Sequence, residues 1–168
     1  MARDRPLVAG DAGRPGLETG EHPVSVPALG SVRVCGLDFT RTVSTAPATP
    51  LGTGNRRDLV LVYELWREGR RLSLGLVPFV PSKHLALADP QFRTAVEETA
   101  GGFEIEVTAG RLARFVWLAL EEADVIFSDN YFDLPAGRTV DVRLPALDGW
   151  HAERVRRALR VRSLFDSY

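Results

Sequence analysis

The fold is decided by one stretch, RLARFVWLALEEADVIFSDNYFDLPAGRTVDVRL, residues 111–144. Its first part, LARFVWLAL, is apolar on both faces apart from Arg114, which is typical of a central strand covered on both sides. Its last part, TVDVRL, alternates apolar with polar residues and predicts a strand with one wet face. Between them lies the polar and aromatic segment FSDNYFDLPAG, residues 127–137, whose role is the main question that the sequence raises.

Working outward, the same alternation recurs on both sides of this stretch. FEIEV, residues 103–107, predicts another half-buried strand, RALRVRSL closes the chain in the same way, and WHAERVRRAL is compatible with one or two helical turns. Short strands with turn signals every eight to twelve residues are the pattern of a β-sandwich. Residues 83–168 therefore predict a complete immunoglobulin-like sandwich, and the single cysteine, Cys35, excludes an intrachain disulfide.

The first half of the chain predicts a less complete unit. Residues 1–20 are rich in glycine and proline without apolar periodicity, so we expect them to be disordered. Residues 59–76 predict a hairpin that turns at Gly69, and Val32 and Val34 alternate in a further short run, whereas residues 40–57 predict a long loop. The prolines of PFVPSKHLALADP predict a domain boundary near Ser82. Residues 21–82 would then be a partial β-sandwich with an edge or a face left to cover, in an all-β fold.

Composition excludes several classes of partner. The 168 residues carry a net charge of −1, which gives no long-range field for nucleic acid or anionic lipid. No stretch approaches the length of an apolar membrane span, and the N-terminus lacks the apolar run of a secretory signal. We therefore expect a cytoplasmic protein that binds neither nucleic acid nor membrane.

Few residues have the spacing of catalytic or ligand-binding groups. Asp129 and Asp133 would be about 13 Å apart in an extended chain, whereas glycosidase carboxylates lie about 5 to 9.5 Å apart. His22, His84 and His151 are scattered without a metal-ligand spacing, and no nucleophile elbow, P-loop or dinucleotide fingerprint occurs. The sequence thus predicts no catalytic residue, no metal and no cofactor.

The aromatic side chains leave two interpretations open. A group of them could stack on sugar rings, although aromatic residues on strands more commonly fill a core or an interface: Trp66, Trp117, Trp150, Phe127, Tyr131 and Phe132. Trp117 and Trp150 are the main candidates for a sugar or interface contact. The arginine run from Arg154 to Arg162 has acidic neighbours and is typical of a solvated face.

Taken together, PFVPSKHLALADP, the stretch at 111–144 and the closing RVRSLFDSY resemble the C-terminal part of β-mannosidases of glycoside hydrolase family two. The resemblance covers residues 83–168 strongly, while VSVPALGSVRVCGLDF and LVYELWREGRRLSL are similar to later strands of the preceding sandwich. In that family both sandwiches follow a catalytic (β/α)₈ barrel that carries two catalytic glutamates. No position of this chain matches the motifs of those glutamates.

The resemblance implies a structural role for a signature turn that comprises Phe127, Ser128, Asp129, Asn130, Tyr131, Phe132 and Asp133. Its phenylalanines would pack inward and its Asx side chains would bond turning backbone. It also implies a non-catalytic piece, truncated or split from a β-mannosidase, that is inactive alone and partners a catalytic barrel in cis or in trans. A free-standing module that binds manno-oligosaccharide, or a module for subunit interaction, is the alternative.

Overall fold

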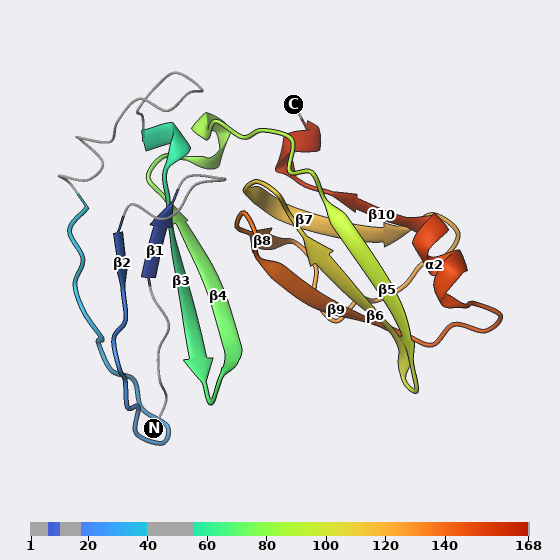
Figure 1. Ribbon diagram of the computed structural model, residues 1–168, viewed down its shortest axis with the longest axis horizontal. Coiled ribbons are helices and arrows are strands. Elements are labelled where there is room, and N and C mark those ends of the chain that lie inside the picture. Colours follow the sequence, from blue (N-terminus) through green and yellow to red (C-terminus); the bar gives the residue numbers. More distant parts are fainter. Residues whose placement is uncertain (1–6, 11–17, 40–55, 168) are drawn as a thin grey trace. The chain divides into compact units, whose positions relative to one another are not determined.

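The computed structural model describes residues 7–10, 18–39 and 56–167 (Figure 1). It comprises two compact units that divide between Ala86 and Leu87. The predicted boundary at Ser82 falls a few residues earlier, where the 3-10 helix η2 (Ser82–His84) begins. The backbone N–H of Ala86 donates to the Arg57 carbonyl oxygen at 2.9 Å, which ties this connection to the first unit.

The first unit contains one antiparallel sheet with the strand order β2-β1-β3-β4. Its elements are β1 (Leu7–Gly10), β2 (Glu18–Gly20), the 3-10 helix η1 (Arg56–Asp58), β3 (Val60–Arg67) and β4 (Arg70–Pro78). The predicted hairpin is present, because Arg67 pairs with Arg70 across a two-residue turn. Glu68 and Gly69 both have positive φ, 52° and 80°. A type I′ turn requires this, and glycine supplies it at low cost.

Two expectations for the first half need correction. Within residues 1–20, which we expected to be disordered, β1 and β2 form strands. Strand β1 pairs with β3 and β2 pairs with β1, which gives this backbone hydrogen bonds that its own composition does not predict. Conversely, Val32 and Val34 form no strand and remain 47% and 51% exposed, because alternation without a partner strand provides no ladder. The rest of the segment expected to be disordered, and the predicted loop up to Asn55, lie outside the described residues.

The second unit is the predicted β-sandwich, built from two three-stranded antiparallel sheets. One sheet has the order β5-β6-β9, formed by β5 (Arg93–Thr99), β6 (Gly102–Thr108) and β9 (Thr139–Pro145). The other has the order β10-β7-β8, formed by β7 (Ala113–Leu120), β8 (Phe132–Leu134) and β10 (Leu159–Arg162). Strand β5 was not predicted from the sequence. Val96 is its one buried residue, so the strand shows little alternation of apolar and polar residues.

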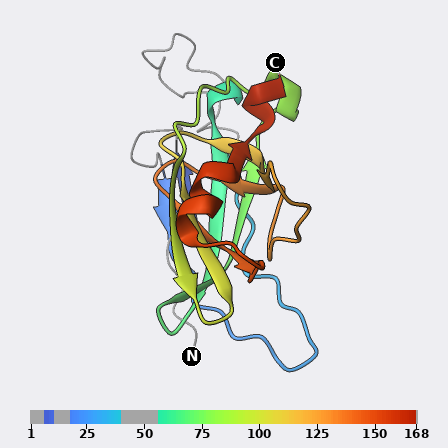
Figure 2. The ribbon, with the colours of Figure 1, turned by 90° about the vertical axis from the view of Figure 1, so that its right-hand side faces the viewer.

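Alternate residues of both sheets point inward and form one core. Fully buried side chains come from five strands and the helix: Val96, Ile105, Val107, Val116, Leu118, Leu134, Val142, Leu144 and Val155. The helix α2 (Ala152–Ala158) lies against β5 and β7 (Figure 2), and the 3-10 helix η3 (Leu164–Ser167) lies against β7. Gly102 has a φ of 134°, and a Cβ there would collide with the Leu144 carbonyl oxygen.

Strand β7 departs from expectation in one respect. It is central in its sheet, as predicted, but its outward side chains are only partly covered. Phe115 is 43% exposed, and Trp117 and Ala119 are half-buried. The apolar character of LARFVWLAL on both faces therefore reflects an inward face that fills the core and an outward face that remains accessible.

Candidate functional site

The signature turn approaches β7 from the edge where β8 lies, and Asp133 meets β7 at a bulge. Ala113 pairs with Leu134 and Val116 pairs with Phe132, so Arg114 and Phe115 together oppose Asp133. The Asp133 Oδ1 atom accepts hydrogen bonds from Arg114 Nε at 2.7 Å and from the Phe115 backbone N–H at 3.1 Å. One carboxylate oxygen thus accepts a hydrogen bond from each of the two bulge residues.

Asn130 continues the ladder where β8 itself has ended. Val116 pairs with Phe132 in an antiparallel register, so the residue opposite Leu118 is Asn130. There the Asn130 side chain takes the place of a strand: Oδ1 accepts from the Leu118 N–H at 2.8 Å and Nδ2 donates to the Leu118 carbonyl at 3.0 Å. An amide is the side chain that offers one acceptor and one donor in this arrangement.

The start of the turn ties the segment to the other sheet. The Ser128 N–H donates to the Arg143 carbonyl oxygen at 2.9 Å, and Ser128 Oγ accepts from the Arg143 N–H at 2.8 Å. Phe127 is 8% exposed in the core, and Phe132 packs against that core. Asp129 accepts only a local bond from the Asn130 N–H at 2.8 Å among the bonds found in the described residues. The segment therefore links β9 of one sheet to β7 of the other.

Arg114 is the buried charge of this site. Its side chain is 8% exposed and that of Asp133 is 19% exposed. The guanidinium carbon lies 4.8 Å from the centre of the Phe115 ring, close enough for a cation–π contact. Its NH1 atom is buried without a hydrogen-bond partner in the described part of the chain. In the sequence, Arg114 is the one charged residue of the apolar strand LARFVWLAL. That charge within an apolar strand is the feature from which a buried ion pair could have been predicted.

The two tryptophans singled out by the sequence lie in different surroundings. Trp150 is half-buried against the core, and the guanidinium carbon of Arg154 lies 4.2 Å from the centre of its ring, so one face of the ring is already occupied. Trp117 lies on the outward face of β7, where it pairs with Arg162 of β10. Trp117 belongs to β7 and Trp150 precedes α2, so the two tryptophans lie on different elements.

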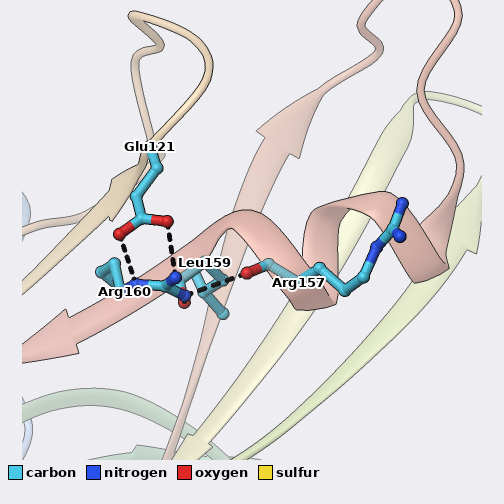
Figure 3. A network of polar contacts seen from close by, with 4 residues as sticks. All are labelled: Glu121, Arg157, Leu159 and Arg160. Carbon is cyan, nitrogen blue, oxygen red and sulfur yellow. Dashed lines mark hydrogen bonds and ion pairs between the residues drawn. The ribbon is translucent and has the colours of Figure 1, made fainter.

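The arginine run lies beside acidic side chains, as the sequence suggested. Arg160 forms two hydrogen bonds with the Glu121 carboxylate, and its NH1 donates to the carbonyls of Arg157 and Leu159 (Figure 3). Arg154 pairs with Glu122 at 2.9 Å. Both pairs hold the turn after β7 to the α2–β10 segment, and their side chains are exposed by 36% or more.

A second polar cluster lies in the first unit. Glu64 has a side chain that is 4% exposed; it accepts from Trp66 Nε1 at 3.1 Å and from Arg71 NH1 at 3.4 Å. In the described residues no three histidine, cysteine or acidic side chains gather in a way that could hold a metal ion. Nor does any described helix have the length and apolar character to cross a membrane.

These features define an immunoglobulin-like sandwich whose most polar segment is engaged in backbone bonds. Comparison with protein families is more specific: residues 87–167 match an Ig-fold domain family, Ig_mannosidase, and residues 12–84 match the family described as mannosidase Ig/CBM-like domain. The chain belongs to the family of C-terminal immunoglobulin-like domains of glycoside hydrolase family two mannosidases.

Solved structures agree on the fold. The crystal structure of β-D-mannosidase from Dictyoglomus thermophilum is similar, with a TM-score of 0.65 and 15% sequence identity. The match covers 95% of this chain and 18% of that chain, so this chain spans less than a fifth of the length of the solved enzyme. A comparison with curated protein sequences gave no match.

Proposed function

We propose that this chain is the non-catalytic sandwich region of a β-mannosidase-like glycoside hydrolase, and that it supports a catalytic barrel present in cis or supplied in trans. The parent activity would be hydrolysis of terminal β-D-mannose residues. One observation carries the proposal: in the segment that most resembles a site, Ser128, Asn130 and Asp133 are all engaged in bonds to backbone or to Arg114. Such groups build a corner between two sheets.

The polar chemistry of the segment supports this proposal over a catalytic role. The Asp133 carboxylate accepts hydrogen bonds from a guanidinium and a backbone N–H, both of which fix its position. Asp129 is exposed, and its carboxylate caps the following residue. Asp133 is thus engaged by Arg114 and by the Phe115 backbone, whereas a glycosidase uses two carboxylates that act on the sugar itself.

The test is reconstitution of activity. The purified chain should not release aryl alcohol from an aryl β-mannoside, and Asp129→Ala should leave that result unchanged. Activity should appear, or rise, when the chain is combined with a polypeptide that carries the β-mannosidase barrel of the same genome. Turnover by the chain alone that disappears with Asp129→Ala would contradict the proposal.

The location of the barrel is a separate question with a direct answer. Translation of the DNA upstream of the Met1 codon in all frames should reveal barrel-coding sequence, either in frame or displaced, if the chain is part of one enzyme. A barrel encoded elsewhere in the genome would indicate assembly in trans. Absence of any barrel-coding sequence would overturn the proposal.

Binding of manno-oligosaccharide is the second candidate, and the exposure of Tyr131, 66%, is the observation that favours it. A tyrosine ring can stack on a sugar face. Titration of the chain with manno-oligosaccharide tests this candidate: millimolar or tighter binding that is lost with Tyr131→Ala would support it.

A further inference from the structure

Most edges of the described sheets are short or partly occupied. Strands β2, β8 and β10 contain only three, three and four residues. Along β5, the Arg156 side chain donates to the Val96 carbonyl oxygen at 2.6 Å, and helix α2 packs against the strand. Along β9, Ser128 bonds both the N–H and the carbonyl of Arg143. Such features limit the pairing of a further strand at these edges.

Strand β4 is the exception. It has nine residues, RRLSLGLVP, and lies at one end of the strand order β2-β1-β3-β4 (Figure 1). Its outer edge pairs with no strand among the described residues. Residues 72–77 contain no charged side chain, and Leu72 and Val77 are largely exposed. A long apolar edge of this kind is a template for an added strand. We call the outer side of residues 72–78 the open edge.

One segment of the same unit has the sequence of a strand but no partner. Residues 31–37, SVRVCGL, belong to no helix or strand, and Val32, Val34 and Leu37 are largely exposed. No backbone hydrogen bond joins these residues to the rest of the described chain. They follow β2, which lies at the opposite end of the sheet from β4. We call residues 31–37 the donor segment.

The donor segment and the open edge are complementary in one antiparallel register. In this register Val32 lies opposite Val77, and the two side chains share one face of the sheet. Two residues further along, Val34 lies opposite Gly75. The Tyr63 ring occupies the space over Gly75 on that same face, so Val34 would lie beside the ring. Apolar side chains of the donor segment would therefore meet apolar side chains of the β3–β4 hairpin.

Other registers are less favourable. A slip by one residue would turn Arg33 toward this apolar face, because neighbouring side chains of a strand point to opposite faces. The chosen register also brings Asp38, which follows the donor segment, opposite Arg71 at the start of β4. Opposite charges that face each other across two strands are favourable. The register is thus supported by both the apolar pattern and the charges.

We propose that two copies of this chain form a dimer in which the donor segment of each copy adds to the open edge of the other. Residues 21–30 connect β2 to the donor segment and reach about 33 Å when extended. The sheet is three strand spacings wide from β2 to β4, about 14 Å. The connection is therefore long enough for an exchange, and an exchange by both copies closes the assembly with two-fold symmetry. This inference concerns the first unit and does not depend on the proposed function.

Cys35, the one cysteine of the chain, provides a direct test because the register sets it opposite Leu74. Opposed residues of antiparallel strands have Cα atoms about 4.5–5.5 Å apart, a separation that a disulfide can bridge. Leu74→Cys in the intact 168-residue chain should give a covalent dimer on mild oxidation, measured by non-reducing gel electrophoresis. Leu76→Cys is the matched control: Leu76 is also half-buried, but it lies diagonal to Cys35 at about 7–8 Å. It should give about tenfold less covalent dimer.

A second comparison leaves the sheet itself unchanged. Val34→Asp places a charge within the donor segment, and Val26→Asp places the same charge on a comparably exposed valine outside it. Light scattering over a concentration series should show the wild type and Val26→Asp reaching twice the mass of one chain. Val34→Asp should raise the dissociation constant of the dimer about tenfold or more, because the charge would enter an apolar contact.

Four outcomes would overturn the proposal. The first is a wild-type chain that remains monomeric up to its solubility limit. The second is a disulfide of Leu74→Cys formed within one chain, which would show that the donor segment pairs with its own β4. The third is an equal yield of covalent dimer from Leu74→Cys combined with Cys35→Ser, which would show that two β4 edges pair with each other. The fourth is an equal yield from Leu76→Cys, which would contradict the register.

Discussion

The second unit buries one face of each of its two sheets, whereas the described part of the first unit is one sheet with apolar residues on both faces. In the second unit, inward residues from both sheets meet in a shared core, and Ile105, Val116 and Leu134 are fully buried. In the first unit, Val60 and Val62 are buried on one face of β3. On its other face Tyr63 and Leu65 remain 46% and 41% exposed.

This difference shows where the stability of the chain resides. The register pairs Tyr63 with Gly75 and Leu65 with Ser73, and Val77 on the same face is also 45% exposed, so apolar side chains on this face of the β3–β4 hairpin remain accessible. The Tyr63 ring lies over Gly75, which has no side chain of its own there. A closed sandwich gains from burial on both of its sheets, while a single sheet gains from one face only.

The most direct test of this difference in burial is to replace one leucine by alanine in each unit. Leu134→Ala removes a fully buried side chain and should lower the free energy of unfolding by about 2–5 kcal/mol. Leu65→Ala removes a side chain that is 41% exposed and should change it by about 0.5 kcal/mol or less. Chemical denaturation followed by far-UV circular dichroism measures both, and equal losses would show that Leu65 is covered in solution.

The next largest effect should come from Asp133. Asp133→Ala leaves the buried Arg114 guanidinium without its carboxylate, and breaking a buried ion pair costs about 3–5 kcal/mol. Because Asp133 is 19% exposed, we expect a loss at or below the lower limit of this range, about 2–3 kcal/mol. The double variant Arg114→Met with Asp133→Ala is the control: it should recover part of the loss. A single variant as stable as the wild type would show that water replaces Asp133 fully.

A smaller loss should follow removal of the amide that extends the β7 ladder. Asn130→Ala leaves the Leu118 N–H and carbonyl without their side-chain partner and should cost about 1–3 kcal/mol. Asn130→Asp retains the acceptor but sets a carboxylate against the Leu118 carbonyl, so it should not rescue stability. Hydrogen exchange provides a local readout, because the Leu118 amide should lose protection in Asn130→Ala. Asp129→Ala, next in the chain, should leave that amide protected.

Much of the second unit could be predicted from the sequence because its strands carry their own signal. FEIEV and TVDVRL alternate, and each forms a strand whose apolar residues are buried, except for Val140, which is half-buried. Strand β5 carries no such signal, since its pairing with β6 and its contact with α2 hold it in place while most of its side chains stay exposed. Pairing between distant segments is not encoded in local periodicity.

The same limit applies to the candidate site. Sequence resemblance indicated that the Asx side chains of residues 127–133 bond backbone, but it did not identify their partners. Those partners lie 12 to 19 residues away: Leu118 for Asn130, Phe115 and Arg114 for Asp133, and Arg143 for Ser128. The bulge in β7 sets the contacts of Arg114 and Phe115 with Asp133, and a one-residue irregularity cannot be located from composition.

The smallest effect should come from the ion pairs that fasten the α2–β10 segment to the turn after β7. Glu121→Gln weakens the contact with Arg160 (Figure 3), whose side chain is 44% exposed. Exposed pairs contribute about 0.2–1 kcal/mol and are screened by salt, so the loss should be about 0.5 kcal/mol and should shrink in 1 M salt. The guanidinium retains its bonds to the carbonyls of Arg157 and Leu159, which limits the loss further. A loss as large as that of Asp133→Ala would mean that the closed unit depends on its surface charges rather than on its core.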